Sequence, residues 1–504
     1  MTLAERGVGS WLVTRAGGLL GTGWIPFSLF LLIVGFECYK HASRLPIMPW
    51  ILGDSFSYLE FSDIRPHGYP LVLEAFQEIT GGLRYLPQFQ VGLYYASLAA
   101  LAVAVALRVG SVVAAIPVFL LGEREPALPF DGVMSDAVFT SLLALGAASF
   151  FLYQHRGQLL WLGAASLLVG AAAACRTTGY VPLTCLWVFA LFAIAALPSN
   201  QRRSLRVRIA LFAVVPALLA LSIAAGSNLH RNGDFRIGSW AGVSLLGKGL
   251  VLASPLPPAH PMSRFNPLAE ITSRARATLD EIQDPILKML ITRQYYDYLR
   301  WFIAWKMIPD LEPKWQTSTG VQMEKTARDL ALAYIQQDPA GYLKLALNDY
   351  ITLWLVPRVL TRQEVITLRD RYSRIRDVVF LRAFAQTPEG QNEYYSVIPS
   401  PTPRMNVYAI RTGSFLFLAL STGMAMFLIC TRFRGASQFF DLIFVSVVIH
   451  LSYVAIALSE GGFERYVSAT WPLLSAAISG MVFRGFQLFA PMRLGACLTS
   501  RGLK

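Results

Sequence analysis

The chain has 504 residues, of which 54% are hydrophobic and only 15% charged, and its formal net charge is +13. With a mean hydropathy of +0.47, this composition is typical of a polytopic membrane protein and excludes an ordinary soluble domain. The positive charge is therefore first a topology signal, and because no long basic run alternates with aromatic residues, nucleic acid is not expected as a partner.

Ten apolar runs lie near the length of about 17–25 residues that a membrane span needs. The first follows Arg6 and Arg15 but precedes no small-x-small cleavage site, so we interpret it as a retained anchor. The third is short and contains Pro117. The runs cover residues 20–38, 91–107, 109–122, 133–153, 158–175, 179–197, 209–226, 412–430, 438–458 and 467–483.

The arginines predict the orientation of these runs. If all ten cross and the N-terminus is cytoplasmic, nine arginines near the ends of the runs fall on the cytoplasmic side, as the positive-inside rule requires. If 109–122 did not cross, the basic cluster QRRSLRVR would lie outside, so this run is predicted to form a tight hairpin with 91–107. The arginines placed inside are Arg108, Arg156, Arg202, Arg203, Arg206, Arg208, Arg432, Arg434 and Arg484.

The same topology places the long segment 227–411 outside, and this segment is too long for a linker. It contains an amphipathic stretch at 323–337, which Asp338-Pro339 ends, and a second at 341–356 whose apolar face suits the membrane surface. The predicted fold class is an all-α polytopic membrane protein with a mainly helical extracytoplasmic domain. Its parts are a cytoplasmic N-terminus (1–19), a transmembrane module (20–226) with outer loops 39–90 and 123–132, the extracytoplasmic domain (227–411), C-terminal transmembrane helices (412–484) and a cytoplasmic tail (485–504).

The cysteines have no paired spacing, and four of the five lie inside or beside apolar runs. We interpret them as small core residues rather than as a disulfide framework or metal ligands. They are Cys38, Cys175, Cys185, Cys430 and Cys497.

A polar stretch, GDSFSYLEFSDIRPHGYPL, follows the first apolar run on the outer face. Asp54 and Tyr58 are four residues apart and share one helical face. In a purely structural interpretation, Asp54 caps a short interfacial helix. The sequence RPHGYP is then a rigid turn, in which Gly68 permits a positive φ.

Three further outer segments carry charge at the membrane boundary. Asp136 lies at the mouth of the run 133–153, where a carboxylate is costly unless it is paired or functional. Arg176 follows the run 158–175 on the same side. Carboxylates and arginines that converge there suit a phosphate-bearing lipid whose reactive end lies in water. The last outer loop adds Glu460, Glu464, Arg465 and Tyr466.

Four segments, in this order, resemble motifs of the GT-C superfamily of membrane glycosyltransferases. GDSFSYL followed by RPHGYPLVLEAF resembles the first outer loop of its bacterial members, which has an Asp, a nearby Tyr and an Arg-Pro-x-Gly-Tyr-Pro turn. VMSDAVFTSLLALG resembles the start of the fourth span, CRTTGYVPL the Arg-x-x-Gly segment, and FERYVSATWPLL the late Glu-Arg-Tyr…Pro motif. The similarity is to the branch of the protein O-mannosyltransferases and lipid A aminoarabinose transferases, and it covers residues 20–226 and 410–485.

This resemblance implies a GT-C-like bundle of about ten transmembrane helices in a bacterial inner membrane, with an active site on the periplasmic side. It also implies a polyprenyl-phosphate sugar donor and a glycan, lipid or protein acceptor of the envelope. The transfer would invert the configuration at the anomeric carbon of the sugar. Asp54 would be the general base, and Asp136 would orient the acceptor or help to hold a divalent cation. Arg176 and Arg465 would stabilise the leaving phosphate. The residues implied to bind substrate are Tyr58, Arg65, Tyr69, Arg176, Glu464, Arg465 and Tyr466.

The chain departs from the family pattern at two positions. Several relatives have two adjacent acids where this chain has Asp54 and Ser55, and their second-loop acid is often Glu rather than Asp136. The roles of the two carboxylates and the presence of a metal therefore stay open. Arg65 either contacts phosphate or braces the loop. A structural role is expected for His67 and a surface position for Lys248. Glu460 and Glu464 either belong to the site or only form ion pairs with Arg465.

Two other classes of protein remain alternatives to the enzyme. A lipid or glycan transporter usually keeps ionisable groups near the bilayer midplane, whereas these runs are nearly free of charge at their centres. A non-enzymatic subunit of an envelope assembly would use 227–411 as its docking surface, and a degenerate transferase could keep the fold without turnover.

Overall fold

The structure is a computed structural model. It describes residues 24–51, 54–123, 130–197, 203–238, 240–280, 308–311, 320–355, 404–431, 439–459 and 464–500, together with residues 283, 288 and 292. Among them no strand occurs, and the predicted all-α class is confirmed for this part of the chain. The helices are α2 (Trp24–Ala42), α3 (Ser55–Leu59), α4 (Gly68–Thr80), α5 (Leu86–Val109), α6 (Ala115–Gly122), α7 (Asp136–Arg156), α8 (Leu159–Cys175), α9 (Tyr180–Ala195), α10 (Arg203–Asn232), α11 (Ala241–Leu252), α12 (Asn266–Asp280), α14 (Ile308–Leu311), α15 (Gly320–Gln337), α16 (Pro339–Leu355), α20 (Arg404–Cys430), α21 (Phe440–Ser459) and α22 (Glu464–Ser500).

Six helical segments of the described residues are long and apolar enough to cross a membrane, so the protein is an integral membrane protein. Each of the ten predicted runs falls mainly on a helix, but only six of the described helical segments are both long and apolar enough to span, and the number ten stays a prediction. The six segments are Leu86–Val109, Asp136–Arg156, Thr177–Ala195, Arg203–Asn232, Thr412–Cys430 and Phe440–Ser459.

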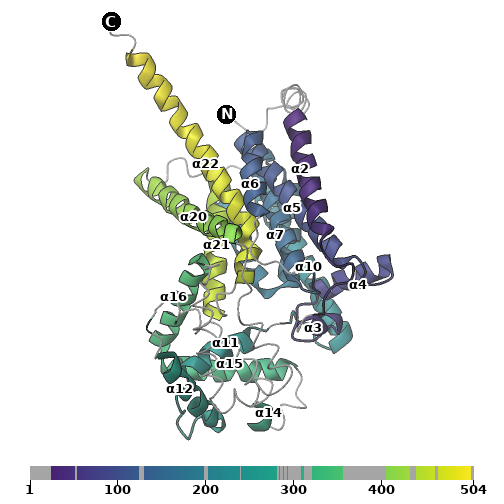
Figure 1. Cartoon of the computed structure of the whole chain (residues 1–504), viewed down its shortest axis with the longest axis vertical. Coiled ribbons are helices and arrows are strands. Elements are labelled where there is room, and N and C mark those ends of the chain that lie inside the picture. Colours follow the sequence, from purple (N-terminus) through teal and green to yellow (C-terminus); the bar gives the residue numbers. More distant parts are fainter. Residues whose placement is uncertain are drawn as a thin grey trace.

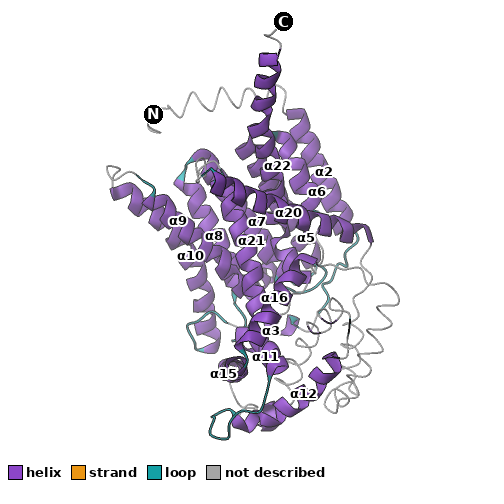
Figure 2. Ribbon diagram, turned by 90° about the vertical axis from the view of Figure 1, so that its left-hand side faces the viewer, coloured by secondary structure: helices purple, strands orange, loops and turns teal. Residues whose placement is uncertain are grey.

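The apolar helices form one bundle. Helices α3 and α4 lie at one end of this bundle, and α11, α12, α14 and α15 lie beyond that end, whereas α22 projects past the opposite end (Figure 1). We call the end with α3 and α4 the loop end. Figure 2 shows α8, α9 and α10 along one side of the bundle, and α16 between the bundle and α11.

Helices α5 and α6 form the tight hairpin that the sequence predicts. Gly110 adopts φ = 79° just after α5, a backbone conformation that glycine reaches without strain. The Tyr94 hydroxyl donates a hydrogen bond of 2.7 Å to the carbonyl of Gly122 and so ties the end of α6 back to α5.

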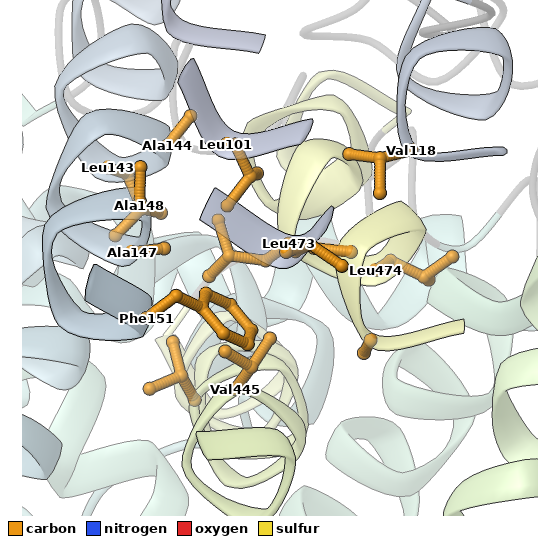
Figure 3. Packing of buried hydrophobic residues seen from close by; sticks show 14 of the residues in the cluster. Leu101, Val118, Leu143, Ala144, Ala147, Ala148, Phe151, Val445, Leu473 and Leu474 are labelled. Carbon is orange, nitrogen blue, oxygen red and sulfur yellow. The ribbon is translucent and has the colours of Figure 1, made fainter. Parts of the chain in front are cut away.

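The buried core joins the N-terminal and C-terminal parts of the chain. Helices α5, α6 and α7 meet α21 and α22 in one apolar cluster (Figure 3). Small residues on one face of α7 let neighbouring helices approach closely, which is how apolar helices associate in a membrane. The labelled members of the cluster are Leu101, Val118, Leu143, Ala144, Ala147, Ala148, Phe151, Val445, Leu473 and Leu474.

An arginine pair neutralises a buried carboxylate at the end of the bundle opposite the loop end. Asp441 lies in the first turn of α21 and is fully buried. Its Oδ2 lies 2.6 Å from Arg108 Nε and 3.1 Å from Arg484 Nη2. Arg108 ends α5 and Arg484 lies in α22, so one charge cluster fixes three helices at the same level.

Helices α15 and α16 are separated as predicted, because Asp338 lies between them and Pro339 opens α16. The backbone N–H of Gly341 donates to Asp338 Oδ1 at 2.8 Å, which caps the new helix. Helix α16 packs along α21, with the Tyr342 hydroxyl on the carbonyl of Leu458 and the Tyr350 hydroxyl on His450, and its expected place at the membrane surface stays a prediction.

The surface position expected for Lys248 is wrong. Lys248 lies in α11, is fully buried and forms an ion pair of 2.7 Å with Asp349 of α16. Its amino group also donates to the carbonyl of Ala457, near the end of α21. The local sequence LLGKGL gives no sign of this, because both partners come from distant helices.

The Arg108–Asp441–Arg484 cluster gives a first prediction. Asp441→Ala leaves two arginines without their carboxylate partner, and removing one member of a buried ion pair costs about 3–5 kcal/mol. We expect the variant to lose monodispersity at a clearly lower temperature than the wild type in detergent. Asp280→Ala is the control, because Asp280 is 64% exposed and pairs with Lys288 at the surface. Equal thermal stability of the two variants would contradict the prediction.

Candidate functional site

The stretch after α2 folds so that its first acid meets its arginine. Asp54 stands at the N-cap position of α3, but its side chain makes no capping hydrogen bond. Instead, Arg65 Nη2 donates to Asp54 Oδ1 at 2.7 Å, and Arg65 Nε donates to Ser57 Oγ at 3.1 Å. Capping is therefore not the role of this carboxylate.

Two aromatic rings lie beside the guanidinium of Arg65. Its guanidinium carbon lies 5.2 Å from the centre of the Tyr58 ring and 5.1 Å from that of Trp240, within the range of cation–π attraction. Only 13% of the Arg65 side chain is exposed. These contacts favour bracing of the loop over phosphate binding. The sequence gives no signal for Trp240, because it belongs to no motif and to no periodic pattern.

A second carboxylate and arginine pair where α7 begins and α8 ends. Asp136 is the first residue of α7, and Arg176 follows α8 in an extended conformation. Arg176 Nη1 forms an ion pair with Asp136 Oδ1. The Asp136 side chain is 1% exposed and that of Arg176 is 14% exposed. The arginine therefore neutralises a buried carboxylate while part of it reaches the surface.

Tyr58 joins the two ion pairs. Its hydroxyl lies 3.0 Å from Oγ of Ser135, the residue before Asp136. Its ring meets Tyr69 edge-on at 5.1 Å between centres. The structure thus brings together six of the predicted site residues, and we call them the paired-carboxylate site. They are Asp54, Tyr58, Arg65, Tyr69, Asp136 and Arg176.

Tyr69 positions the second outer loop. Burial raises the pKa of Tyr69 well above its usual value, and Tyr58 and Asp136 raise it further. The phenol therefore stays protonated, and it donates to Oε1 of Gln90 at 3.3 Å. Because the Gln90 amide donates at 3.0 Å to the carbonyls of Phe130 and Gly132, Tyr69 holds the loop rather than acting as an acid or a base.

Backbone contacts join the first and second outer loops. The Trp50 N–H donates to the carbonyl of Asp131 at 2.7 Å, and the Val133 N–H donates to the carbonyl of Trp50 at 3.1 Å. The Ser55 hydroxyl donates to the carbonyl of Val133 at 3.0 Å. This pairing sets Asp54 and Asp136 in one place, although the sequence separates them by a complete helical hairpin.

Gly68 is needed for space and not for its backbone conformation. The expected positive φ is not found, because Gly68 is the first residue of α4 and its φ is not positive. A Cβ at this position would lie 2.6 Å from the carbonyl carbon and oxygen of Ala174 and 2.8 Å from the nitrogen of Cys175. The missing side chain lets α4 rest on the end of α8, directly before Arg176.

His67 ties the same turn to α10. Its Nδ1 lies 3.1 Å from Ser227 Oγ, and its Nε2 lies 3.4 Å from Asn232 Nδ2. The ring packs edge-on against Phe61. Both ring nitrogens are engaged inside the fold, in agreement with the structural role expected for this residue.

The last predicted segment stands at the start of α22. Glu464, Arg465 and Tyr466 are the first residues of this helix, but their side chains lie outside the described residues, as does all of Glu460. Their place in the paired-carboxylate site therefore stays a prediction.

No three His, Cys, Asp or Glu side chains are grouped to hold a metal ion in the part of the chain that the structure describes. Asp136, which the family resemblance offers as a ligand of a divalent cation, forms an ion pair with Arg176. A cation at that carboxylate would compete with the arginine.

No protein-family model matches the chain, and comparison with curated proteins and with solved structures gives no match either. The function is therefore inferred from the paired-carboxylate site, which brings together three of the four sequence motifs.

The seat of α4 on α8 gives a second prediction. Gly68→Ala must push α4 away from the backbone of Ala174, so we expect a lower melting temperature and lower yield of folded protein. Gly92→Ala in α5 is the control, since nothing lies within 4 Å of its added Cβ and alanine favours a helix over glycine by about 1 kcal/mol. A melting temperature for Gly68→Ala as high as that of Gly92→Ala would refute this account of the turn.

The third prediction concerns pH. Burial lowers the pKa of His67 below its ordinary value of 6.5, although hydrogen bonds with the backbone of Ser62 and Phe61 oppose this. The unfolded chain then binds more protons than the folded chain just below pH 6.5, so stability falls as the pH drops through that range. His67→Gln should reduce the loss of thermal stability between about pH 7 and pH 5. His230→Gln, at an exposed position of α10, should leave that loss unchanged.

Proposed function

We propose that the protein is a glycosyltransferase of a bacterial inner membrane, which moves a sugar from a polyprenyl-phosphate donor to an envelope acceptor on the extracytoplasmic face. The observation that carries the proposal is the paired-carboxylate site, where two Asp–Arg pairs from separate segments meet at the loop end. A bundle of about ten crossing helices, with the loop end outside, belongs to the same proposal.

The difference in burial between the two carboxylates supports different roles for them in this proposal. Asp54 keeps 14% of its side chain exposed, whereas Asp136 keeps 1%. A general base must come within hydrogen-bond reach of the proton that it accepts, so Asp54 is the base in this proposal. Arg65 orients the Asp54 carboxylate, and Asp136 positions Arg176.

Arg176 is the residue for the lipid phosphate. Its guanidinium reaches the surface beside Asp136, and a planar fork of N–H donors suits phosphate oxygens. A fixed positive charge placed where negative charge develops stabilises the transition state, because the site needs no reorganisation during the reaction. In this assignment Arg65 braces the base and Arg176 binds the leaving group.

The reaction is a single displacement. The acceptor oxygen forms a bond to the anomeric carbon of the sugar as its proton passes to Asp54. The bond between the anomeric carbon and the phosphate oxygen breaks, and its electron pair leaves with polyprenyl phosphate. Attack opposite the leaving group inverts the anomeric centre.

The same ion pairs would also suit a subunit without turnover, because they hold the outer loops against the bundle in either case. A transporter is less well supported, since the buried carboxylates of the described residues are paired with arginine or lysine. Turnover is therefore the property that separates the enzyme from both alternatives.

The fourth prediction tests turnover. Purified protein in liposomes is given a panel of polyprenyl-phosphate sugars with an envelope extract as acceptor, and free polyprenyl phosphate is measured by mass spectrometry. We expect release from one donor, and Asp54→Asn should slow it by about 10²–10⁴-fold, since this is the usual contribution of a general base.

Asp63→Asn is the matched control. Asp63 belongs to the same loop and pairs with Arg236 at 3.5 Å, but lies outside the paired-carboxylate site. Its variant should keep activity near the wild-type level. Full activity of Asp54→Asn would overturn its assignment as the base, and release from no donor by folded protein would favour the transporter or the assembly subunit.

A further inference from the structure

Helix α16 carries charge within an otherwise apolar sequence, PAGYLKLALNDYITLWL, and it does not qualify as a span by length and composition. Its two charged residues, Lys344 and Asp349, make it a poor candidate for the hydrocarbon region. Its contacts nevertheless place it lengthwise against the apolar helices, between the bundle and α11 (Figures 1 and 2).

Two contacts fix the register of α16 against α21, and they show that the two helices run antiparallel. The Tyr342 hydroxyl donates to the carbonyl of Leu458 at 2.6 Å, and the Tyr350 hydroxyl lies 2.9 Å from Nδ1 of His450. The Trp354 ring, one turn of α16 beyond Tyr350, packs at the same level of α21, 5.2 Å from the His450 ring and 4.6 Å from the Tyr453 ring. The eight residues from Leu458 to His450 correspond to about 12 Å of helix, so α16 follows α21 from the loop end to about half of its length.

The Trp354 end of α16 also reaches α20. The Trp354 ring stacks on Phe417 with 5.6 Å between centres and 11° between planes. Phe417 lies within the apolar segment Thr412–Cys430, which is long enough to span a membrane. The C-terminal end of α16 is therefore enclosed by two spanning segments on its inner side.

The inner face of α16 contains its carboxylate, and that charge is neutralised. Asp349 and Lys248 are both fully buried and form an ion pair of 2.7 Å. Lys248 also donates to the carbonyl of Ala457, in the last turn of α21. The negative end of the helix dipole lies there and stabilises a positive charge. A paired carboxylate can lie at a depth where a lone one would be strongly disfavoured.

The outer face of α16 is an apolar stripe. Leu343, Leu347 and Ile351 follow one another at intervals of four residues and are 62%, 58% and 42% exposed. On the neighbouring helix α21, Leu451 and Val454 are likewise 46% and 39% exposed. Large apolar side chains of this exposure on spanning helices face lipid in a membrane protein.

We propose that α16 is a half-inserted helix, which enters the membrane at the loop end and whose Leu343–Leu347–Ile351 stripe contacts lipid acyl chains. The ion pair between Lys248 and Asp349 makes this insertion tolerable, and Lys344 lies near the entrance, from which its amino group extends to water. This arrangement is independent of sugar transfer.

A fluorescence-quenching experiment tests the proposal. Single cysteines replace Leu343, Leu347 or Ile351 in full-length protein without its native cysteines, and each is labelled with a small environment-sensitive fluorophore in liposomes. We expect quenching by lipids that carry a nitroxide on the acyl chain, with the deeper nitroxide more effective at 351 than at 343. Iodide in the aqueous phase should have little effect at 351.

Two control positions calibrate the probes. Ser273 on α12 is exposed beyond the loop end and should respond to iodide. Leu219 within the apolar helix α10 is 57% exposed and should respond to the acyl-chain nitroxide. Quenching of position 351 by iodide as strong as at 273 would overturn the proposal, and so would a lack of quenching by either probe, which would show that protein covers the stripe.

The ion pair is tested separately. Lys248→Met leaves Asp349 buried without its cation and should lower the yield of folded protein. The double variant Lys248→Met/Asp349→Leu removes both charges and should recover that yield, because apolar residues of similar size can replace a buried pair. A double variant no better than the single one would show that the pair does not permit insertion.

Discussion

The cost of placing a carboxylate in an apolar bundle is the constraint on which much of this structure depends. An ionised carboxylate loses several kcal/mol of hydration when it leaves water. In the described part of the chain, three carboxylates are fully buried, and each lies against an arginine or a lysine. They are Asp136, Asp349 and Asp441.

Each of these pairs joins segments that are distant in sequence, and so each carries information about the fold. Asp441 brings the ends of α5 and α21 to the level of Arg484, at the end of the bundle opposite the loop end. Asp349 fastens α16 to Lys248 of α11, and Lys248 also donates to a carbonyl in the last turn of α21. Asp136 fixes Arg176 after α8, where the missing side chain of Gly68 lets the first outer loop approach. The ion pairs thus fix the relative positions of the helix ends, and apolar side chains pack between these positions.

The pair between Asp54 and Arg65 differs from these three because it lies at the surface of the fold and keeps some exposure. Two aromatic rings hold its arginine, and one of them, Trp240, comes from the segment beyond the loop end. An accessible carboxylate held in a fixed orientation, next to an arginine that is partly accessible, is what transfer from a lipid phosphate would require. The same group also couples the outer segment mechanically to the bundle, and this coupling would persist in a protein without turnover.

The sequence by itself determined the membrane class, the all-helical content and the break at Asp338-Pro339, because these depend on local composition and on the backbone limits of proline. It also selected Asp54 and Asp136, since polar residues at the boundary of apolar runs stand out. Only the tertiary structure decided the partners of these carboxylates, the need for a bare backbone at Gly68, the burial of Lys248 and the place of Trp240. Each of these depends on residues far apart in the chain, and local periodicity carries no information about which distant helix supplies the neutralising charge.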